Sequence, residues 1–139
     1  MAVDSLPVEH LFTLEITAAM GDAYQVYNGP AGRRLIASIS GGTFTGPKLA
    51  GTVAPLTGAD WVTLRADKSL RLDVRLVLQT HDGATIFMYY GGIGVGGNFR
   101  SAPYFETGDE RYSWLNNVQG VGIGTIGSTG PTYEIYALR

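Results

Sequence analysis

Glycine and proline interrupt this chain so often that long helices have little room to form. Twenty of its 139 residues are glycine and six are proline. A glycine within a helix costs roughly 1 kcal/mol relative to alanine, and a proline costs more. The longest stretch free of both residues runs only from Ala59 to Asp82. The sequence therefore predicts a protein built mainly from short β-strands that are separated by turns.

The clearest strand signal lies inside that stretch. Every second residue from position 70 to 78 is aliphatic, which is the period of a strand with one apolar face; these residues are Leu70, Leu72, Val74, Leu76 and Leu78. A second strand is expected at 61–64. A third is expected at 85–90, because Asp82-Gly83 is a favoured two-residue hairpin turn.

Short segments of the same kind recur along the rest of the chain. We expect further strands at 10–18, 34–40, 44–53, 99–106, 116–124 and 133–138. One short helix is expected at about 108–114, where Thr107 and Glu110 have the spacing of a capping box. Nine or ten closely spaced strands favour one all-β domain, 1–139, that forms a sandwich or a closed or nearly closed antiparallel barrel. Closure would remove exposed strand edges.

Composition excludes several classes of function. The chain has no cysteine, which excludes disulfides, thiolate zinc sites and cysteine nucleophiles. Its net charge is −2 without a basic cluster, so no nucleic-acid partner is expected. Two isolated histidines, His10 and His81, do not make a metal site. The segments 92–97 and 122–127 match G-x-G-x-x-G, but no helix is expected after either, so no dinucleotide or other cofactor is predicted.

No targeting or membrane-spanning segment is evident in the sequence. The first ten residues lack the cationic and apolar regions of a signal peptide. No uninterrupted apolar stretch approaches the roughly 20 residues that span a bilayer. We therefore expect a cytoplasmic protein with no membrane partner.

The hairpin turn also predicts which side chains share a face. A two-residue turn at Asp82-Gly83 places Arg75 opposite Tyr90, with Asp73 on the same face. Two interpretations are open. Either the leucine-rich face of 70–78 forms the core and Asp73 and Arg75 form an exposed ion pair, or the mixed face lines a lumen where Asp73, Arg75 and Tyr90 contact a ligand. A register shift of one residue would exchange the two faces.

Several short sequence motifs follow one another in a characteristic order along nearly the whole chain. They are Gly32-Arg33-Arg34, Gly41-Gly42-Thr43-Phe44, Gly46-Pro47, Gly58-Ala59-Asp60-Trp61, Leu72-Asp73-Val74-Arg75, Asp82-Gly83-Ala84, Tyr90-Gly91, Arg100, Pro103, Phe105-Glu106-Thr107, Tyr112, Trp114-Leu115-Asn116 and Tyr133-Glu134-Ile135-Tyr136. In these blocks the chain resembles the DUF3237 (UPF0311) family. One departure is Lys68, where the family pattern usually has a turn glycine.

The resemblance implies an antiparallel β-barrel of the calycin-like or allene-oxide-cyclase-like kind, with about eight to ten strands, one short helix and little indication of activity. Because Asp73, Arg75 and Tyr90 all fall on family blocks, the resemblance favours the interpretation in which they line a functional lumen.

The first hypothesis is a cofactor-independent enzyme of lyase, isomerase, cyclase or hydratase type. Its substrate would be a small, largely apolar carbonyl or aromatic metabolite bound in the lumen. Asp73 would act as general base, Arg75 would hold an enolate or carboxylate, and Tyr90 would donate a proton. Further candidate substrate-binding residues are Asp60, Trp61, Arg100, Glu106, Trp114 and Asn116.

Two alternatives belong to other classes. One is a binding protein that carries a small hydrophobic ligand without converting it. The other is a structural module whose leucine-rich face forms a homo-oligomer. Of the three hypotheses, the enzyme is the one that the sequence favours.

Overall fold

The computed structural model describes residues 1–18 and 20–139. Within this part of the chain it contains eleven strands and two short 3-10 helices. The strands are β1 (Val8–Ala18), β2 (Tyr24–Gly29), β3 (Gly32–Thr45), β4 (Ala50–Val53), β5 (Ala59–Leu64), β6 (Leu70–Thr80), β7 (Thr85–Val95), β8 (Asn98–Ser101), β9 (Tyr104–Glu106), β10 (Gly120–Ile126) and β11 (Pro131–Leu138). The helices are η1 (Met20–Asp22) and η2 (Glu110–Asn117). Neither described helix is long and apolar enough to cross a membrane.

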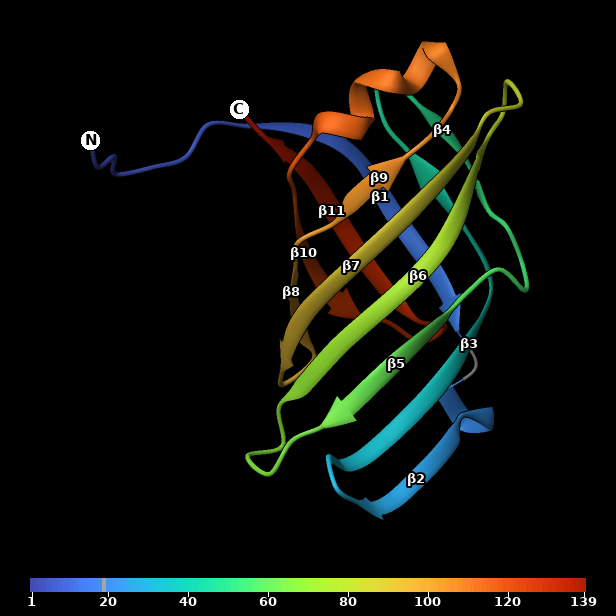
Figure 1. Ribbon diagram of the computed structural model, residues 1–139, viewed down its shortest axis with the longest axis vertical. Coiled ribbons are helices and arrows are strands. Elements are labelled where there is room, and N and C mark those ends of the chain that lie inside the picture. Colours follow the sequence, from blue (N-terminus) through green and yellow to red (C-terminus); the bar gives the residue numbers. More distant parts are fainter. Residues whose placement is uncertain (19) are drawn as a thin grey trace.

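Eight of the described strands form a closed antiparallel barrel (Figure 1). The order around the ring is β6, β5, β3, β1, β11, β10, β8 and β7, and β7 pairs again with β6. β4 bridges β3 and β6, β9 pairs with β7, and β2 pairs with β3. The expected antiparallel β-barrel is confirmed.

Several strand boundaries differ from the expected ones. β3 is one strand of 14 residues, whereas the sequence predicts two strands at 34–40 and 44–53. β2 is not predicted, because five of its six residues are exposed and no alternation marks a buried face. The expected strand 99–106 divides into β8 and β9 before Pro103, which has no N–H to donate to a ladder.

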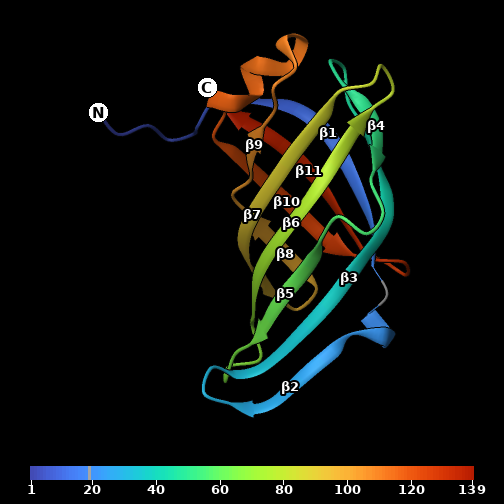
Figure 2. The ribbon, with the colours of Figure 1, turned by 45° about the vertical axis from the view of Figure 1, so that its right-hand side comes forward.

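One half of the barrel is filled by aromatic and aliphatic side chains. The ring of Phe12 packs edge-to-face against those of Phe44 and Phe105, with centroids 5.4 and 6.0 Å apart. Other fully buried side chains from β6, β7 and η2 are Leu76, Leu78, Ile86, Met88 and Leu115. η2 covers this end of the barrel (Figures 1 and 2). Each large apolar side chain stabilises the fold by about 1.5–3 kcal/mol when it is buried, so this capped end anchors the barrel.

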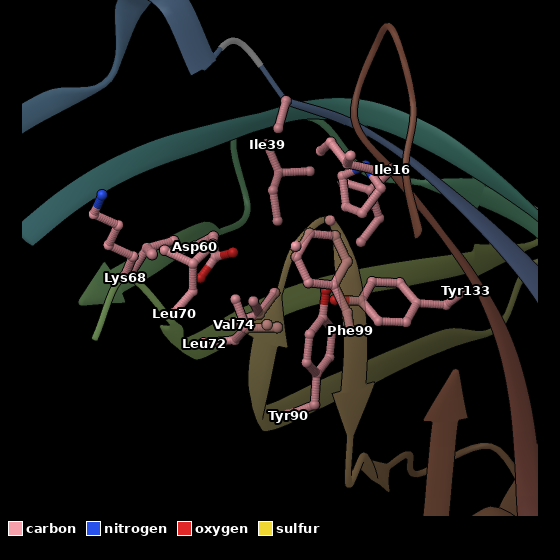
Figure 3. Close-up of a pocket in the computed structure, with 17 residues that line it drawn as sticks. Ile16, Ile39, Asp60, Lys68, Leu70, Leu72, Val74, Tyr90, Phe99 and Tyr133 are labelled. Carbon is pink, nitrogen blue, oxygen red and sulfur yellow. The ribbon is translucent and has the colours of Figure 1, made fainter. Parts of the chain in front are cut away.

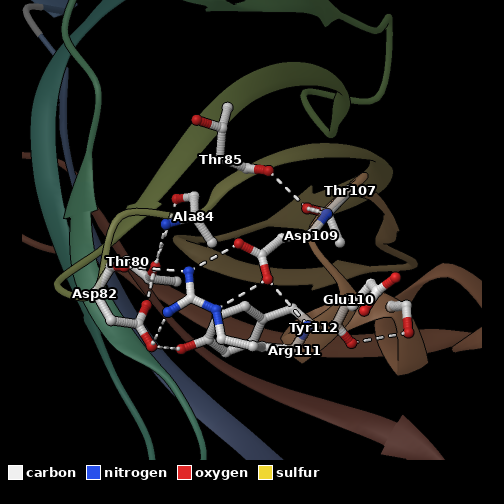
Figure 4. A network of polar contacts seen from close by, with 10 residues as sticks. Thr80, Asp82, Ala84, Thr85, Thr107, Asp109, Glu110, Arg111 and Tyr112 are labelled. Atoms are coloured by element: carbon white, nitrogen blue, oxygen red, sulfur yellow. Dashed lines mark hydrogen bonds and ion pairs between the residues drawn. The ribbon is translucent and has the colours of Figure 1, made fainter.

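A polar clamp ties η2 to the turn between β6 and β7 (Figure 4). Asp82 in this turn accepts hydrogen bonds from the hydroxyls of Thr80 and Tyr112, at 2.5 and 2.7 Å. It also forms an ion pair with Arg111 at 3.3 Å, and Arg111 binds the carboxylate of Asp109 at 2.8 Å. The hydrogen bonds donated by the Thr80 and Tyr112 hydroxyls hold the pKa of Asp82 below its usual value. The clamp therefore stabilises the fold at neutral pH and weakens only when acid protonates Asp82.

The start of η2 differs from the predicted capping box. Asp109 is the N-cap residue, and its carboxylate accepts a hydrogen bond from the Arg111 N–H at 3.0 Å. The Thr107 hydroxyl instead donates to the Thr85 carbonyl at 2.7 Å and accepts from the Asp109 N–H at 3.2 Å. The helix expected at 108–114 consequently runs from Glu110 to Asn117.

The β6–β7 hairpin is offset by one residue from the predicted pairing. The Thr80 N–H donates to the Ala84 carbonyl at 3.0 Å and closes the hairpin, so the loop inside this pair has three residues, 81–83, rather than two, and Gly83 adopts a φ of 94° within it. Tyr90 therefore pairs with Val74 instead of Arg75. Because alternate residues point to opposite faces of a strand, this offset turns Tyr90 into the barrel.

The expectation that Asp73 and Arg75 line the lumen is wrong. Their side chains lie on the outer surface of β6, 40% and 53% exposed, and form an ion pair at 3.2 Å. The Arg75 guanidinium also lies over the ring of Tyr89, 4.8 Å from its centroid. The leucine-rich face of β6 points into the barrel, where its apolar surface leaves water. That face is thus unavailable as the oligomer interface considered above.

Two adjacent glycines of β7 provide a matched test of the barrel packing. A Cβ at Gly92 would lie 2.4 Å from the Arg100 carbonyl oxygen, whereas a Cβ at Gly91 would meet nothing closer than 3.7 Å. We predict that Gly92→Ala lowers the free energy of unfolding by about 2 kcal/mol or more, because the backbone of β8 must move. Gly91→Ala should be neutral or stabilise by about 0.5 kcal/mol through the unfolded chain. Urea unfolding of both variants checks this, and equal effects would contradict it.

Candidate functional site

The half of the barrel opposite η2 contains a cavity. Its volume is about 460 Å³, and residues of the β5–β6 and β7–β8 turns contribute to its wall (Figure 3). The lining is mostly aliphatic or aromatic and includes Ile16, Ile39, Val62, Leu70, Leu72, Val74 and Phe99. This volume and lining suit a small, largely apolar molecule.

Three polar side chains from three strands face the cavity: Asp60 of β5, Tyr90 of β7 and Tyr133 of β11. Asp60 pairs with Val74 of β6, and Val74 pairs in turn with Tyr90, so the register brings the carboxyl and the phenol onto one stretch of wall. The rings of Tyr90 and Tyr133 meet edge-to-face with centroids 5.3 Å apart. Figure 3 shows their hydroxyl groups pointing toward each other.

The Asp60 carboxyl group lies in an otherwise apolar part of the wall. Burial raises the pKa of Asp60 to about 6. The hydrogen bond that Asp60 Oδ1 accepts from the Asp73 N–H, at 3.3 Å, opposes this rise, and the negative charge of Asp73 adds to it. A carboxylate with this pKa is ionised at neutral pH and is a stronger base than an ordinary aspartate, which suits proton abstraction.

The two phenols stay protonated at neutral pH. Burial raises the pKa of Tyr90 well above its ordinary value, and the neighbouring Tyr133 and Asp60 raise it further. Burial likewise raises the pKa of Tyr133. Two protonated phenols in an apolar cavity can donate hydrogen bonds to a carbonyl oxygen or to an oxyanion that develops on it.

The structure brings two of the predicted site residues, Asp60 and Tyr90, into this cavity. Trp61 follows Asp60 on β5 and consequently points outward, 45% exposed. Arg100 points outward from β8 and borders an open hollow on the outer surface together with Arg71.

Glu106, Trp114 and Asn116 lie near the capped end and not in the cavity lining. Glu106 is exposed at the end of β9. Trp114 is half-buried on η2, and the Lys48 ammonium lies 5.2 Å from its ring centroid. The Asn116 side chain accepts from the Thr107 N–H at 2.8 Å and donates to its carbonyl at 3.0 Å, which fixes the entry to η2.

Tyr133 is a site residue that the sequence does not predict. A signal for it exists on the neighbouring strand β10, where Gly120, Gly122 and Gly124 occupy alternate positions. A Cβ at Gly124 would lie 2.5 Å from the Tyr133 ring. Gly124 therefore marks the place where the Tyr133 ring lies against β10, whereas Gly120 and Gly122 would clash first with Pro103 and Ser101.

The described residues contain no group of three or more His, Asp or Glu side chains placed to hold a metal ion. His10 is engaged with the Glu134 carboxylate at 2.8 Å, and His81 lies in the β6–β7 turn.

An antiparallel barrel with an apolar, carboxyl-bearing cavity is the class of protein that these observations define. The chain belongs to the DUF3237 family: the family model, described as a protein of unknown function, matches residues 6–98 and 94–138. A UPF0311 protein of Bradyrhizobium diazoefficiens is 33% identical over 129 residues, which cover 80% of this chain and 82% of that protein. The hydroalkoxylation enzyme phnH of Penicillium herquei is 33% identical over 115 residues, which cover 80% of this chain and 69% of that enzyme.

Solved structures with the same fold agree with this assignment. A β-barrel-like protein of Acinetobacter baumannii superimposes with a TM-score of 0.88 at 26% identity, covering 99% of both chains. An enzyme from Penicillium herquei superimposes with a TM-score of 0.78 at 26% identity, covering 100% of this chain and 99% of that one.

The raised pKa of Asp60 predicts a pH-dependent stability difference. The folded-state value of about 6 exceeds the ordinary value of 3.8, so ionisation of Asp60 destabilises the folded state as the pH rises from about 4 through 6. Asp60→Asn should therefore increase the free energy of unfolding at pH 8, by at most about 3 kcal/mol. Near pH 3.5 the wild type and Asp60→Asn should have nearly the same free energy of unfolding. Denaturant unfolding across this range checks the prediction, and a loss of stability at pH 8 would contradict it.

Proposed function

We propose that this protein is a cofactor-independent enzyme that performs acid/base chemistry on a small, largely apolar molecule held in the barrel cavity. The reaction we propose is the addition of a substrate hydroxyl group across a conjugated carbon–carbon double bond, which corresponds to the cyclase or hydratase type expected above. Asp60, rather than Asp73, is the general base. Tyr90 and Tyr133 are the hydrogen-bond donors.

The observation that carries this proposal is the combination of Asp60 with the two phenols. A carboxyl whose pKa is raised to about 6 by burial faces two protonated hydroxyls across an apolar cavity. Perturbed titratable groups that converge on a pocket are typical of catalytic sites. A relative that is 33% identical is named a hydroalkoxylation enzyme, which gives independent support for addition of a hydroxyl group.

The proposed reaction balances without any further reactant. Asp60 takes the proton of the substrate hydroxyl as its oxygen bonds to the carbon β to a carbonyl. The electron pair of the double bond moves onto the carbonyl oxygen, which accepts hydrogen bonds from Tyr90 and Tyr133. The protonated Asp60 then returns its proton to the α-carbon. The O–H bond has been added across the double bond, and Asp60 is again a carboxylate.

A defined probe tests this proposal: 2′-hydroxychalcone, whose phenol adds to its own enone to give flavanone. We predict that the protein accelerates this ring closure and that Asp60→Asn lowers kcat by about 10²-fold or more, because the base is lost. Loss of chalcone absorbance measures the rate. The wild-type kcat should fall with acid along a limb near pH 6, where Asp60 becomes protonated.

Asp73→Asn is the matched control, because Asp73 has the same chemistry but lies on the outer surface. We expect its kcat to change by less than about threefold. Since the charge of Asp73 contributes to the raised pKa of Asp60, the acid limb should move to lower pH in this variant. Equal losses in Asp60→Asn and Asp73→Asn would overturn the assignment of Asp60 as the base.

The two phenols are tested by removing one hydroxyl at a time. Tyr90→Phe and Tyr133→Phe should each lower kcat by about 10- to 100-fold with a smaller change in KM, because the hydrogen bond strengthens as the oxyanion forms. The double variant should lose less than the product of the single losses, since the hydroxyls act as a pair. Changes confined to KM would assign the tyrosines to substrate binding instead.

The binding-protein hypothesis gives a different result with the same variants. A carrier would bind the probe without converting it, and Asp60→Asn would keep or improve the affinity, because a neutral amide is easier to bury than a carboxylate. Tight binding without turnover for a range of hydroxylated enones would favour that alternative.

A further inference from the structure

Lys68 lies at the mouth of the cavity in an unfavourable backbone conformation. It belongs to the β5–β6 turn and contributes to the cavity lining, and Figure 3 places it at the opposite end of that lining from Tyr133. Its φ is 70°, in the left-handed region that glycine adopts freely and that disfavours a residue with a Cβ. A lysine at this position therefore does not serve the stability of the turn.

The rest of the turn holds this conformation in place. The Arg65 N–H donates to the Ser69 carbonyl and the Lys68 N–H to the Arg65 carbonyl, both at 2.9 Å. The Asp67 carboxylate accepts from the Ser69 N–H at 2.9 Å, and Arg65 Nε donates to the Ser69 hydroxyl at 2.8 Å. The neighbouring charges of Arg65 and Asp67 are thus engaged within the turn, and the turn fixes where the Lys68 side chain starts.

The ammonium group of Lys68 forms no ion pair with a carboxylate of residues 1–18 or 20–139. Asp60, the carboxyl that also lines the cavity, is not its counter-ion, because Asp60 forms no ion pair within these described residues. The cavity therefore separates its charges, with the carboxyl on the inner wall and an ammonium at the mouth.

A second cation lies beyond Lys68 on the same inner face of the sheet. Arg33 of β3 pairs with Leu64, which pairs with Leu70 of the cavity wall. Its guanidinium donates to Gln25 at 3.0 Å and lies 4.8 Å from the ring centroid of Tyr27, so its contacts are with neutral groups. The β2–β3 hairpin that carries Arg33 extends past the barrel at this end (Figure 2). Two cations, Lys68 in the cavity lining and Arg33 beyond that lining, thus lie on this side of the barrel.

We propose that Lys68, with Arg33 beyond it, forms an anion-recognition subsite at the cavity mouth, and that the substrate is a largely apolar molecule with a carboxylate or similar anionic oxygen group at one end. This inference rests on the proposed function and adds the charge of the substrate to it. The apolar body would lie against the aliphatic wall, with the reacting hydroxyl near Asp60. The anionic end would stay at the mouth, where an accessible ammonium meets it without full desolvation of either group.

Two fluorescent probes of nearly the same shape separate charge from apolar binding. 1-Anilinonaphthalene-8-sulfonate carries an anionic group, and N-phenyl-1-naphthylamine is its neutral counterpart. We expect both to bind the wild-type protein and to compete with each other. Lys68→Gln should weaken binding of the sulfonate about five- to tenfold, as expected for one charge-assisted contact, and leave the neutral probe within about twofold. The salt dependence of sulfonate binding should also decrease in this variant.

Arg71→Gln is the matched control for net charge. Arg71 is an exposed cation on the outer face of β6, beside the outer hollow and away from the cavity mouth. Its loss changes the total charge by the same amount and should leave both affinities nearly unchanged. An equal loss of sulfonate binding in Arg71→Gln and Lys68→Gln would overturn the proposal.

The outcomes also distinguish this inference from the proposed function. Competitive binding of both probes with no effect of Lys68→Gln would overturn the anion subsite and leave the acid/base proposal intact. Failure of both probes to bind would count against the cavity as a ligand site, and so against both proposals.

Lys68→Gly gives a second, independent readout. Glycine relieves the left-handed backbone, so this variant should have a higher melting temperature than the wild type while losing the same preference for the anionic probe. A lower melting temperature would show that the lysine stabilises the turn, which would overturn the argument for a role in recognition.

Discussion

The alignment of β6 with β7 decides which side chains enter the barrel. The two strands share a continuous ladder that runs from Leu70–Gly94 to Gln79–Thr85. The three-residue turn at its end sets the register, and Asp82 of that turn is bound by Tyr112 of η2. The cavity at one end of the molecule thus depends on a short polar cluster at the other, because the β6–β7 pairing runs without a register shift from the turn to the cavity.

Two residues of the cavity work against the stability of the fold. Asp60 presents a carboxylate to an apolar wall, and Lys68 places a side chain where the backbone favours glycine. A neutral residue in place of Asp60 would remove the buried charge, and glycine in place of Lys68 would remove the unfavourable φ. Residues of this kind are expected where a site must hold a reactive or recognising group in an environment that does not favour it.

The architecture was accessible from the sequence, and the orientation of the site was not. Alternation in 70–78 and frequent turn residues predict an all-β sandwich or barrel, and the resemblance to the DUF3237 family favours the antiparallel barrel. The same alternation marks β6, which contributes Leu70, Leu72 and Val74 to the cavity wall. Asp82-Gly83 was recognised as a turn, but whether two or three residues form it depends on Thr80 and η2, which lie outside the dipeptide. That one residue pairs Tyr90 with Val74 and so turns it inward, whereas Asp73 and Arg75 are on the surface because the leucine-rich face of β6 is buried. Tyr133 was missed because its role depends on a ring crossing β10, a contact that no local pattern of β11 reveals.

The division of the barrel into a filled end and a hollow end also bears on how such proteins diversify. The packed aromatic cluster and η2 hold one end together, while the cavity at the other end includes residues of the β5–β6 and β7–β8 turns. Chains only 26% identical to this one keep the same frame, with TM-scores of 0.88 and 0.78. Exchanging the β5–β6 and β7–β8 turns would therefore change which molecules the cavity binds while the barrel itself stays intact. This separation makes the barrel a suitable scaffold for engineering new ligand selectivity.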